Sequence, residues 1–428
     1  MQLLPWRDGR HYGCTSVELF AAWLFSNRRV KRRATGVNYH MKNRNLYKDC
    51  SPAVVAGLCS HGLAICRALS RRGIPLIALE SNTTLPGYAT SSAEVVGVPE
   101  VNGESLIGSL VETGRRLTGG KKPVLFLTND NMVDLIGRRW SELSGLYILS
   151  WSSSRENVTR LLDKRFCEEF LRDRNYPLPG TWLVDRARPG TELPGDIPFP
   201  AVVKPSRPLG EFKALRVENR EALLELLAKH PNTPVVIQEW IPGGDEQIYF
   251  CATVARRGKP LCFFDGTKYL SHPPARGQTV AAGPGAKTEL RGLLTRLVED
   301  AQLDGPVSLE AKLDPEGRFR IIEPTVGRTD FWAKLAIVNG VDLSWIEYRS
   351  VTAKEHNFVE PATQVPRVWF DSEKDPFSYI RLAVTISRDL KRPWLPSFSY
   401  LDLRDLKPYW RALSILQNRI RQYVRRRL

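Results

Sequence analysis

The chain has 428 residues, of which 42% are hydrophobic, and it carries a formal net charge of +16. This length predicts two or three domains with well-filled cores. No apolar run approaches the roughly eighteen residues of a membrane-spanning helix, so no transmembrane helix is predicted. The seven cysteines form no close Cys-x-x-Cys pair, which predicts reduced thiols in the cytoplasm and argues against a zinc site.

Residues 1–45 lack a clear globular pattern and include the basic run Arg28-Arg-Val-Lys-Arg-Arg33. We interpret this stretch as a basic, poorly ordered N-terminal extension. No signal peptide is predicted, because these charges follow the apolar run Val17–Phe25 instead of preceding it.

A βαβ unit is predicted next. Ala53–Gly57 is typical of a short buried strand, Leu63–Arg72 of a helix and Gly73–Leu79 of a second, parallel strand. Glycines 57 and 62 flank the connecting turn. They could serve an anion at the helix N-terminus or tight packing of the turn, and packing is the favoured explanation.

Two carboxylates lie on one predicted hairpin. Val307–Leu313 alternates as a strand does, the turn residues Asp314–Gly317 follow, and Arg318–Glu323 returns. A four-residue loop would pair the last residue of the first strand with the first residue of the second. In that register Glu310 and Glu323 share a face, one diagonal step apart, with roughly 7 Å between their Cβ atoms.

Such a pair of carboxylates needs a cation, because two charges this close do not both stay ionised without one. Mg²⁺ takes one or two carboxylates and completes its shell with water and substrate phosphates. Lys204, which ends the apolar strand Ala201-Val-Val-Lys-Pro205, would neutralise the same phosphates. The alternative is a surface hairpin with solvated charges.

Five motifs follow one another along the chain. They are Asp163-Lys164 before Pro177-Leu-Pro-Gly-Thr181, then Phe199–Pro205, Val235–Glu246, the hairpin with Glu310, and Ile321–Arg328. In this order and at this spacing they resemble the ATP-grasp superfamily, in particular its carboxylate–amine ligase-like members, over roughly residues 52–350. The resemblance implies an α/β fold, in which an N-terminal βαβ pre-ATP-grasp domain precedes the two-layer α+β ATP-grasp domains.

The resemblance also implies four parts of the chain. They are the basic N-terminal extension (1–45), the pre-ATP-grasp α/β domain (46–150), the ATP-grasp domain with the nucleotide and metal site (151–355), and a C-terminal extension with a basic tail (356–428). In ATP-grasp proteins the N-terminal domain helps to bind the substrate that is not ATP.

ATP and Mg²⁺ are the cofactors that the resemblance implies. Lys164 and Lys204 match the two lysines that hold ATP phosphates, where a cation meets charge that develops during phosphoryl transfer. Asp245 or Glu246 matches the acid that binds the ribose hydroxyls, and we take Glu246 as the candidate. The strand and linker that bracket adenine are matched by Gln238, Glu239, Trp240 and Ile241.

The chain departs from the family pattern at two places. The loop Ser206–Lys213 keeps only Gly210, where the family has several glycines, so side-chain donors including Lys213 would replace backbone amides. The metal motif has Thr325 where asparagine is common, and its hydroxyl is a weaker ligand for Mg²⁺ than the family's amide. The metal set is therefore Glu310, Glu323 and Thr325.

The activity that the resemblance implies is an ATP-dependent carboxylate–amine, or carboxylate–thiol, ligase that acts through an acylphosphate. Its partners would be a small-molecule carboxylate and an amine. Arg276 and Arg328 are the candidates for holding the carboxylate and its phosphate, with a surface ion pair as the alternative for each.

Two other functions compete with the ligase. The sparse glycines and Thr325 suggest an ATP-binding scaffold whose catalysis has decayed, although both glutamates are retained. The net charge of +16 suggests nucleic-acid binding, but no helix-turn-helix, zinc finger or aromatic RNA platform supports a specific nucleic-acid partner. The stretch Tyr409–Leu428 mixes apolar residues with arginines and could dock on the enzyme or lie peripherally on an anionic membrane.

Overall fold

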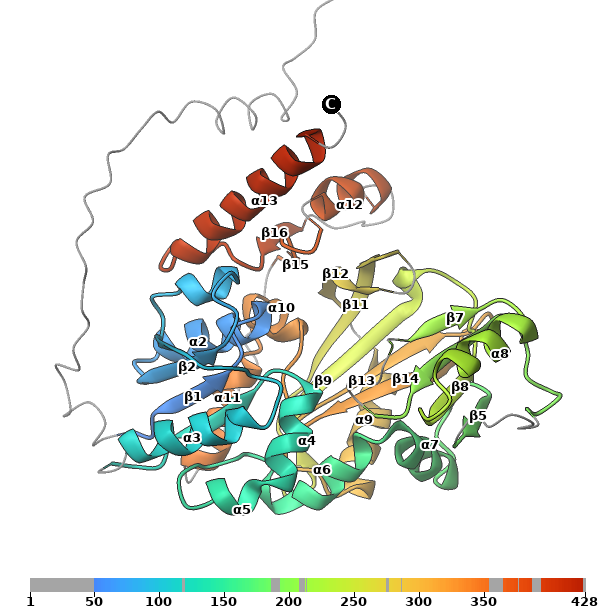
Figure 1. Cartoon of the computed structure of the whole chain (residues 1–428), viewed down its shortest axis with the longest axis horizontal. Helices are drawn as coiled ribbons and strands as arrows, with labels where there is room; N and C mark the ends of the chain where they lie inside the picture. Colours follow the sequence, from blue (N-terminus) through green and yellow to red (C-terminus); the bar gives the residue numbers. More distant parts are fainter. Residues whose placement is uncertain are drawn as a thin grey trace, which may run out of the picture. The chain divides into compact units, whose positions relative to one another are not determined.

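The computed structural model describes most of the chain from residue 50 onward (Figure 1). The predicted N-terminal extension lies outside the described residues. So do two predicted site residues, Lys213 and Arg276. The described residues are 50–117, 120–185, 193–207, 212, 214–274, 277–285, 287–353, 365–375, 377–386 and 394–425.

The first of three sheets has four parallel strands in the order β3-β2-β1-β4. Its inner strands are apolar and buried, and the helices that link them lie over the sheet, as expected of parallel strands. The predicted βαβ unit is thereby confirmed. The elements are β1 (Ala53–Ala56), α2 (Ser60–Ser70), β2 (Leu76–Glu80), β3 (Glu94–Gly97), α3 (Ser105–Arg116), β4 (Val124–Leu127), α4 (Asp130–Arg138), α5 (Trp140–Leu143) and α6 (Arg155–Leu161).

The turn after β1 is compact. Gly57 has a φ of +90°, a conformation that favours glycine. A Cβ atom on Gly62 would lie 2.0 Å from the carbonyl oxygen of Gly57. Both glycines therefore serve close packing of the turn.

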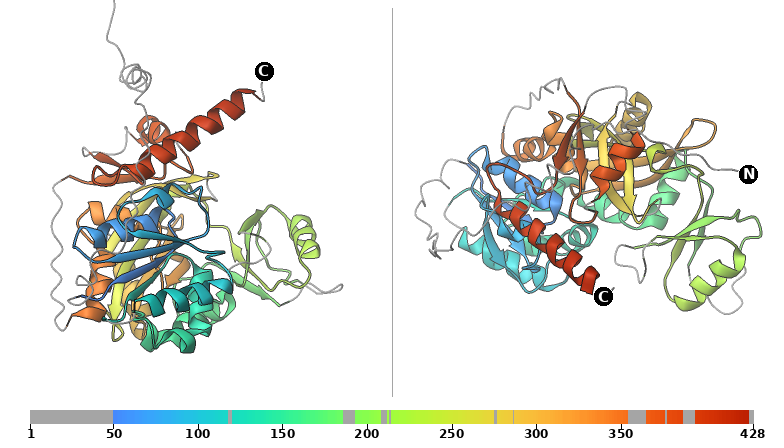
Figure 2. Two further views of the ribbon diagram at one scale, coloured as in Figure 1. Left: turned by 60° about the vertical axis from the view of Figure 1, so that its left-hand side comes forward. Right: turned by 90° about the horizontal axis from the view of Figure 1, so that it is seen from above.

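The second sheet has four antiparallel strands in the order β5-β8-β6-β7. Leu223, Leu226 and Leu227 of α8 pack against its apolar residues, and Figure 2 shows this helix over the sheet. The strand that ends in Lys204 is thereby confirmed. The elements are α7 (Lys164–Asp173), β5 (Thr181–Val184), β6 (Ala201–Pro205), β7 (Leu215–Val217), α8 (Arg220–Lys229) and β8 (Val235–Glu239).

The third sheet has eight strands. Seven of them follow the order β14-β13-β9-β11-β12-β15-β16, and β10 pairs with β9. Helices α9, α10 and α11 bury apolar residues against it. The elements are β9 (Ile248–Arg256), β10 (Lys259–Pro260), β11 (Phe264–His272), β12 (Gln278–Pro284), α9 (Thr288–Asp300), β13 (Gly305–Leu313), β14 (Phe319–Val326), α10 (Trp332–Val338), α11 (Leu343–Thr352), β15 (Arg367–Phe370) and β16 (Leu395–Phe398).

The predicted hairpin is confirmed as β13 and β14, but its predicted register is wrong. Leu313 pairs with Phe319, and an irregularity after Glu310 places Glu310 directly opposite Glu323. The Asp314 carboxylate accepts the Arg318 amide at 2.8 Å, and this contact closes a turn one residue longer than expected. The two carboxylates are therefore direct cross-strand partners instead of diagonal neighbours.

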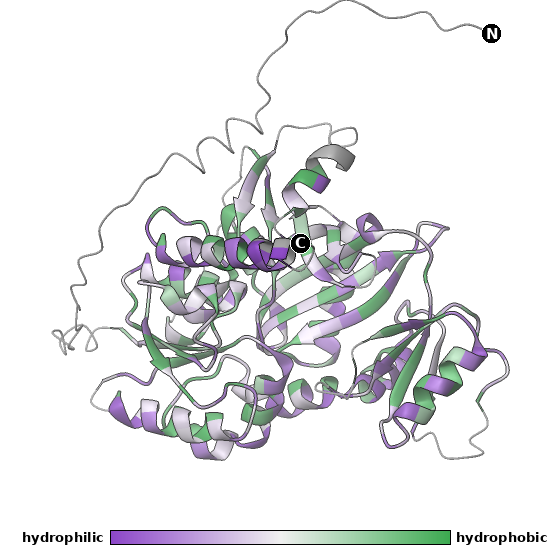
Figure 3. Ribbon diagram, turned by 45° about the horizontal axis from the view of Figure 1, so that its top comes forward, coloured by the Kyte–Doolittle hydropathy of each residue, from purple (hydrophilic) through white to green (hydrophobic). Residues whose placement is uncertain are grey.

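The C-terminal segment continues the fold. Strands β15 and β16 extend the large sheet, and helices α12 (Ser378–Ile386) and α13 (Lys407–Arg425) follow them along the chain. Hydrophilic and hydrophobic residues alternate along α13 (Figure 3). Its Arg411 donates to the carbonyl of Thr83, and Arg419 donates to that of Glu373 at 2.8 Å, so α13 contacts the rest of the chain at both points. In the described part of the chain, no helix is both long and apolar enough to span a membrane.

One core carboxyl group gives a prediction for stability. Glu347 on α11 is 4% exposed and accepts a 2.7 Å hydrogen bond from the Ser150 hydroxyl. Burial raises its pKa from 4.5 to about 8. Between these pH values the folded chain holds a proton that the unfolded chain has lost, so the free energy of unfolding falls as pH rises through this window.

Glu347→Gln keeps the acceptor and cannot ionise, so we expect this variant to be more stable than wild type at pH 7, by up to about 3 kcal/mol. The difference should vanish near pH 4. Urea denaturation across that range measures it. Parallel stability curves for the two proteins would show that Glu347 does not titrate as described.

Candidate functional site

Three elements bring basic and acidic groups together where β6, α7 and β14 meet. Lys204, near the end of β6, is 7% exposed, and its Nζ donates to Gln238 Oε1 at 2.6 Å and to the Ile322 carbonyl at 3.0 Å. Lys164 is the first residue of α7, and its Nζ forms an ion pair with Glu323. The predicted lysines and one predicted metal ligand thus share a site.

A pocket opens at this meeting point. Its polar lining consists of both lysines, Glu323, Glu168 and Asp130. Leu161, Leu162, Val236 and Pro324 form apolar walls. The two ammonium groups can bind an anion such as a phosphate, and the three carboxylates can compensate them in its absence.

The charges in this pocket shift one another's pKa values. Burial would raise the pKa of Glu323, but the charges of Lys164 and Lys204 hold it below its ordinary value. Burial raises the pKa of Glu310, and the charge of Glu323 opposite raises it further against the opposing effect of Lys268. A cation between the two glutamates would reverse the shift at Glu310.

The glutamate pair fits a hard cation. Glu310 and Glu323 are direct partners across the hairpin, and Thr325, two residues along β14, lies on the same face of the strand as Glu323. Among the described residues, no group of three or more His, Cys, Asp and Glu side chains could hold a metal ion by itself. A bound Mg²⁺ would therefore take its other ligands from water and phosphate oxygens.

Burial of Lys204 has an electrostatic consequence. Burial and the charge of Lys164 lower its pKa, while Glu323 and Glu168 oppose the shift. An anion placed against this ammonium would restore the ordinary pKa. A phosphate is such an anion, and its binding is favoured where the existing anions do not fully compensate the lysine.

Three charged residues of this region escaped the sequence analysis. Lys268 on β11 is 7% exposed and is the main cation that stabilises Glu310 as a carboxylate. Asp130 comes three residues after β4, and Asp330 comes four residues after β14. For Asp130 alone a sequence signal was available, because ligands gather beyond the carboxyl ends of buried parallel strands in α/β sheets.

Arg328 lies between the two aspartates. Its Nη1 donates to Asp330 at 2.7 Å, its Nη2 donates to Asp130 at 3.2 Å, and its Nε also bonds to Asp130. These carboxylates raise its pKa. Arg328 therefore forms ion pairs, as in the alternative that the sequence allowed, although they are buried and not at the surface. Binding of a substrate carboxylate by Arg328 stays a prediction.

The predicted adenine strand lies beside the lysine pocket. Gln238 is buried and connects Lys204 to Glu168. The Glu239 amide donates to the Gly180 carbonyl at 2.8 Å, and the carbonyl of Ile241 accepts a 2.9 Å bond from Lys312. Gln238 thus adjoins the lysine pocket, and the adenine role of Gln238, Glu239, Trp240 and Ile241 stays a prediction.

Two features near the end of this strand bear on the base and the ribose. The Trp240 ring lies against Arg216 and Lys312, at 4.6 and 4.9 Å from its centroid. Asp245 is buried and accepts the amide and hydroxyl of Ser271 at 2.7 and 2.6 Å. Glu246 is exposed, and the assignment of the ribose role to Asp245 or Glu246 stays a prediction.

No family model matches the chain. The carbamoyl phosphate synthase large chain of Methanothermobacter thermautotrophicus is 22% identical over 352 residues, which cover 73% of this chain and 32% of that protein. The chain therefore spans about a third of the length of this curated relative.

Solved structures show the same architecture at low sequence identity. One is an ADP complex of purK, an N5-carboxyaminoimidazole ribonucleotide synthetase (13% identity, 79% of this chain and 86% of that chain, TM-score 0.58). Another is the biotin carboxylase domain dimer of Hydrogenobacter thermophilus 2-oxoglutarate carboxylase with MgADP (16%, 73% and 71%, TM-score 0.55). A third is the L-amino acid ligase of Bacillus licheniformis (17%, 73% and 78%, TM-score 0.53). The fold predicted from the sequence is confirmed.

Proposed function

Because the chain has the ATP-grasp fold, we propose that it is an ATP- and Mg²⁺-dependent ligase that joins a small-molecule carboxylate to an amine through an acylphosphate. The observation that carries the proposal is the convergence of Lys164, Lys204, Glu310 and Glu323. The purK and biotin carboxylase structures hold ADP and MgADP, which supports the choice of nucleotide.

Lys204 and Lys164 would bind the β- and γ-phosphates. Lys204 approaches from the strand end and Lys164 from the helix N-terminus, where the exposed amides also favour an anion. On nucleotide binding, Lys164 would exchange Glu323 for phosphate. Glu323 would then be free to join Glu310 in holding Mg²⁺, which would supply charge neutralisation to the phosphates.

The reaction has two steps. A carboxylate oxygen attacks the γ-phosphorus and ADP leaves, which gives an acylphosphate. The amine then attacks the acyl carbon, the C–O bond to phosphate breaks and phosphate leaves. The amine nitrogen releases its proton to water. Both steps depend on positioning and charge neutralisation, for which Lys164 and Lys204 are the candidates, and Arg328 is the candidate for holding the carboxylate.

The sharpest test follows oxygen from the acid into phosphate. We would screen acid and amine panels for ADP release with Mg·ATP, and then repeat the active pair with an oxygen-18-labelled carboxylate. An acylphosphate route moves one labelled oxygen into inorganic phosphate. ADP release that needs both substrates but leaves phosphate unlabelled would refute the acylphosphate, and nucleotide binding without ADP release under any condition would identify a decayed scaffold.

A further inference from the structure

Cys59 occupies the loop between β1 and α2, outside the described phosphate pocket. In the strand order β3-β2-β1-β4, the chain passes from β1 to β2 and β3 on one side of β1, and then crosses to β4 on its other side. Ligands of open α/β sheets bind at such a switch point, beyond the carboxyl ends of the strands. Cys59 therefore lies where the pre-ATP-grasp domain would hold a substrate.

His61 contacts this cysteine in a defined geometry. Its Nε2 lies 3.2 Å from Cys59 Sγ and 2.7 Å from the carbonyl oxygen of Thr128, the residue after β4. A carbonyl oxygen can only accept, so Nε2 carries a proton. This single proton is directed to the Thr128 carbonyl and also lies beside the sulfur, so the positive charge of a protonated His61 is what would stabilise a Cys59 thiolate.

The electrostatics agree with this geometry. Burial would raise the pKa of the Cys59 thiol, but the charge and hydrogen bond of His61 and the Gly62 amide hold it below its ordinary value. Burial would lower the pKa of His61, but Cys59 and Asp330 raise it. By contrast, burial raises the pKa of Cys66 to about 12.

A chain of contacts links this pair to the phosphate pocket. Asp330, which acts on His61, is held by Arg328 at 2.7 Å, and Arg328 also binds Asp130. Asp130 lines the pocket with Lys164 and Lys204. Cys59 is thus linked to the pocket through His61, the charge of Asp330, Arg328 and Asp130.

We propose that Cys59, paired with His61, is a covalent acyl acceptor that takes the acyl group from the acylphosphate before the amine does. This inference rests on the proposed ligase function. The Sγ thiolate attacks the acyl carbon, a C–S bond forms, the C–O bond to phosphate breaks and phosphate leaves. The amine then attacks the thioester, the C–S bond breaks, the thiolate returns to His61, and the amine releases its proton to water.

The surroundings suit such an intermediate. Cys59 and His61 are both half-buried, and restricted water access protects a thioester from hydrolysis.

Acetyl phosphate tests the chemistry without knowledge of the natural acid. The full-length protein is incubated with this acylphosphate, and cysteine peptides are analysed by mass spectrometry. We expect one acetyl group on Cys59, removable by neutral hydroxylamine, and none on Cys66 or Cys167, whose thiols burial keeps protonated. Absence of the acetyl group on Cys59, or equal labelling of Cys66, would overturn the proposal.

The role of His61 has its own readout. Iodoacetamide should alkylate Cys59 at pH about 6 at least about tenfold faster in wild type than in His61→Asn, because each unit of thiol pKa changes the thiolate fraction tenfold. Equal rates in the two proteins would refute the pairing. Circular dichroism checks that the variant is folded, and Cys66 serves as the unreactive thiol in the same sample.

A turnover experiment separates this inference from the ligase proposal. With the acid and amine pair that wild type uses, Cys59→Ala should lose amide formation by at least about 100-fold, the scale of a lost catalytic group, while retaining Mg·ATP binding. If Cys59→Ala ligates at the wild-type rate, the acyl acceptor is refuted and the ligase stands. If wild type releases no ADP with any pair, the ligase fails, and the acyl-acceptor step falls with it, because no acylphosphate then reaches Cys59.

Discussion

Glu323→Gln is expected to lower Mg·ATP turnover by about 100-fold or more, the scale on which loss of a group that stabilises transition-state charge is felt. The amide keeps the shape of the side chain but cannot supply a negative ligand to Mg²⁺. Because Glu323 is only part of the pocket lining and forms its ion pair with Lys164, the fold should persist. ADP release at limiting magnesium measures the effect.

The same hairpin provides a matched control for this prediction. Glu316 lies in the turn, 61% exposed and paired with Arg318, so Glu316→Gln removes the same charge outside the site. Its turnover should equal that of wild type. Glu310→Gln should resemble Glu323→Gln, and wild-type turnover by either of these two at limiting magnesium would refute the metal assignment.

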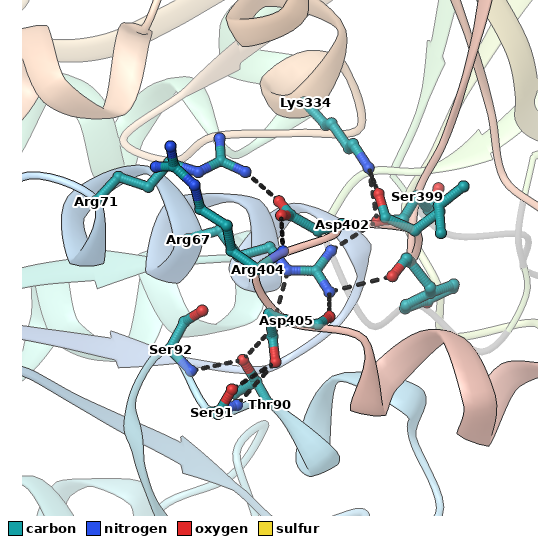
Figure 4. Close-up of polar contacts among 12 residues, drawn as sticks. Arg67, Arg71, Thr90, Ser91, Ser92, Lys334, Ser399, Asp402, Arg404 and Asp405 are labelled. Carbon is teal, nitrogen blue, oxygen red and sulfur yellow. Dashed lines mark hydrogen bonds and ion pairs between the residues drawn. The ribbon is translucent and has the colours of Figure 1, made fainter.

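Arg67→Met is expected to lower the free energy of unfolding by about 3–5 kcal/mol, the usual result of removing one partner of a buried ion pair. Arg67 on α2 is 4% exposed and binds Asp405 at 3.0 Å, as well as the carbonyls of Ser399 and Tyr400 at 3.3 and 3.1 Å (Figure 4). Asp405 also accepts the Thr90 hydroxyl at 2.6 Å. The substitution leaves this carboxylate buried with its main cation removed.

Arg71, the residue directly after α2, is the control. It pairs with Asp402 and is 37% exposed, so Arg71→Met should cost less than about 1 kcal/mol. Urea denaturation compares the two variants. If both variants lose the same small amount of unfolding free energy, the Arg67–Asp405 contact does not hold the C-terminal segment to α2.

Local patterns were enough to predict the strand that carries Lys204 and the hairpin that carries Glu310 and Glu323. Alternation and turn residues identify such elements because they depend on neighbours in the sequence. The register failed for a physical reason. The Asp314 contact to Arg318 lengthened the turn, and the irregularity after Glu310 re-paired the carboxylates. Neither feature has a distinct sequence signal.

The parts that could not be predicted depend on tertiary contacts. The charge of Lys268, on another strand of the sheet, acts on Glu310, and Asp130 and Asp330 both pair with Arg328. Asp405 is separated from Arg67 by 338 positions. No periodicity reports such encounters, so the C-terminal segment could be predicted only as an extension.

The most direct test of nucleotide binding at this site is the affinity for Mg·ATP, measured by isothermal titration calorimetry, of wild type, Lys204→Met and Lys229→Met. Lys204→Met keeps the apolar stem and removes the charge from the pocket, whereas Lys229 is an exposed residue at the end of α8. We predict that Lys204→Met weakens binding by about 1.5–3 kcal/mol, as expected for a charge-assisted hydrogen bond to phosphate, and that Lys229→Met binds as wild type does. Equal affinity of all three proteins for Mg·ATP would contradict the assignment of this pocket to the nucleotide phosphates.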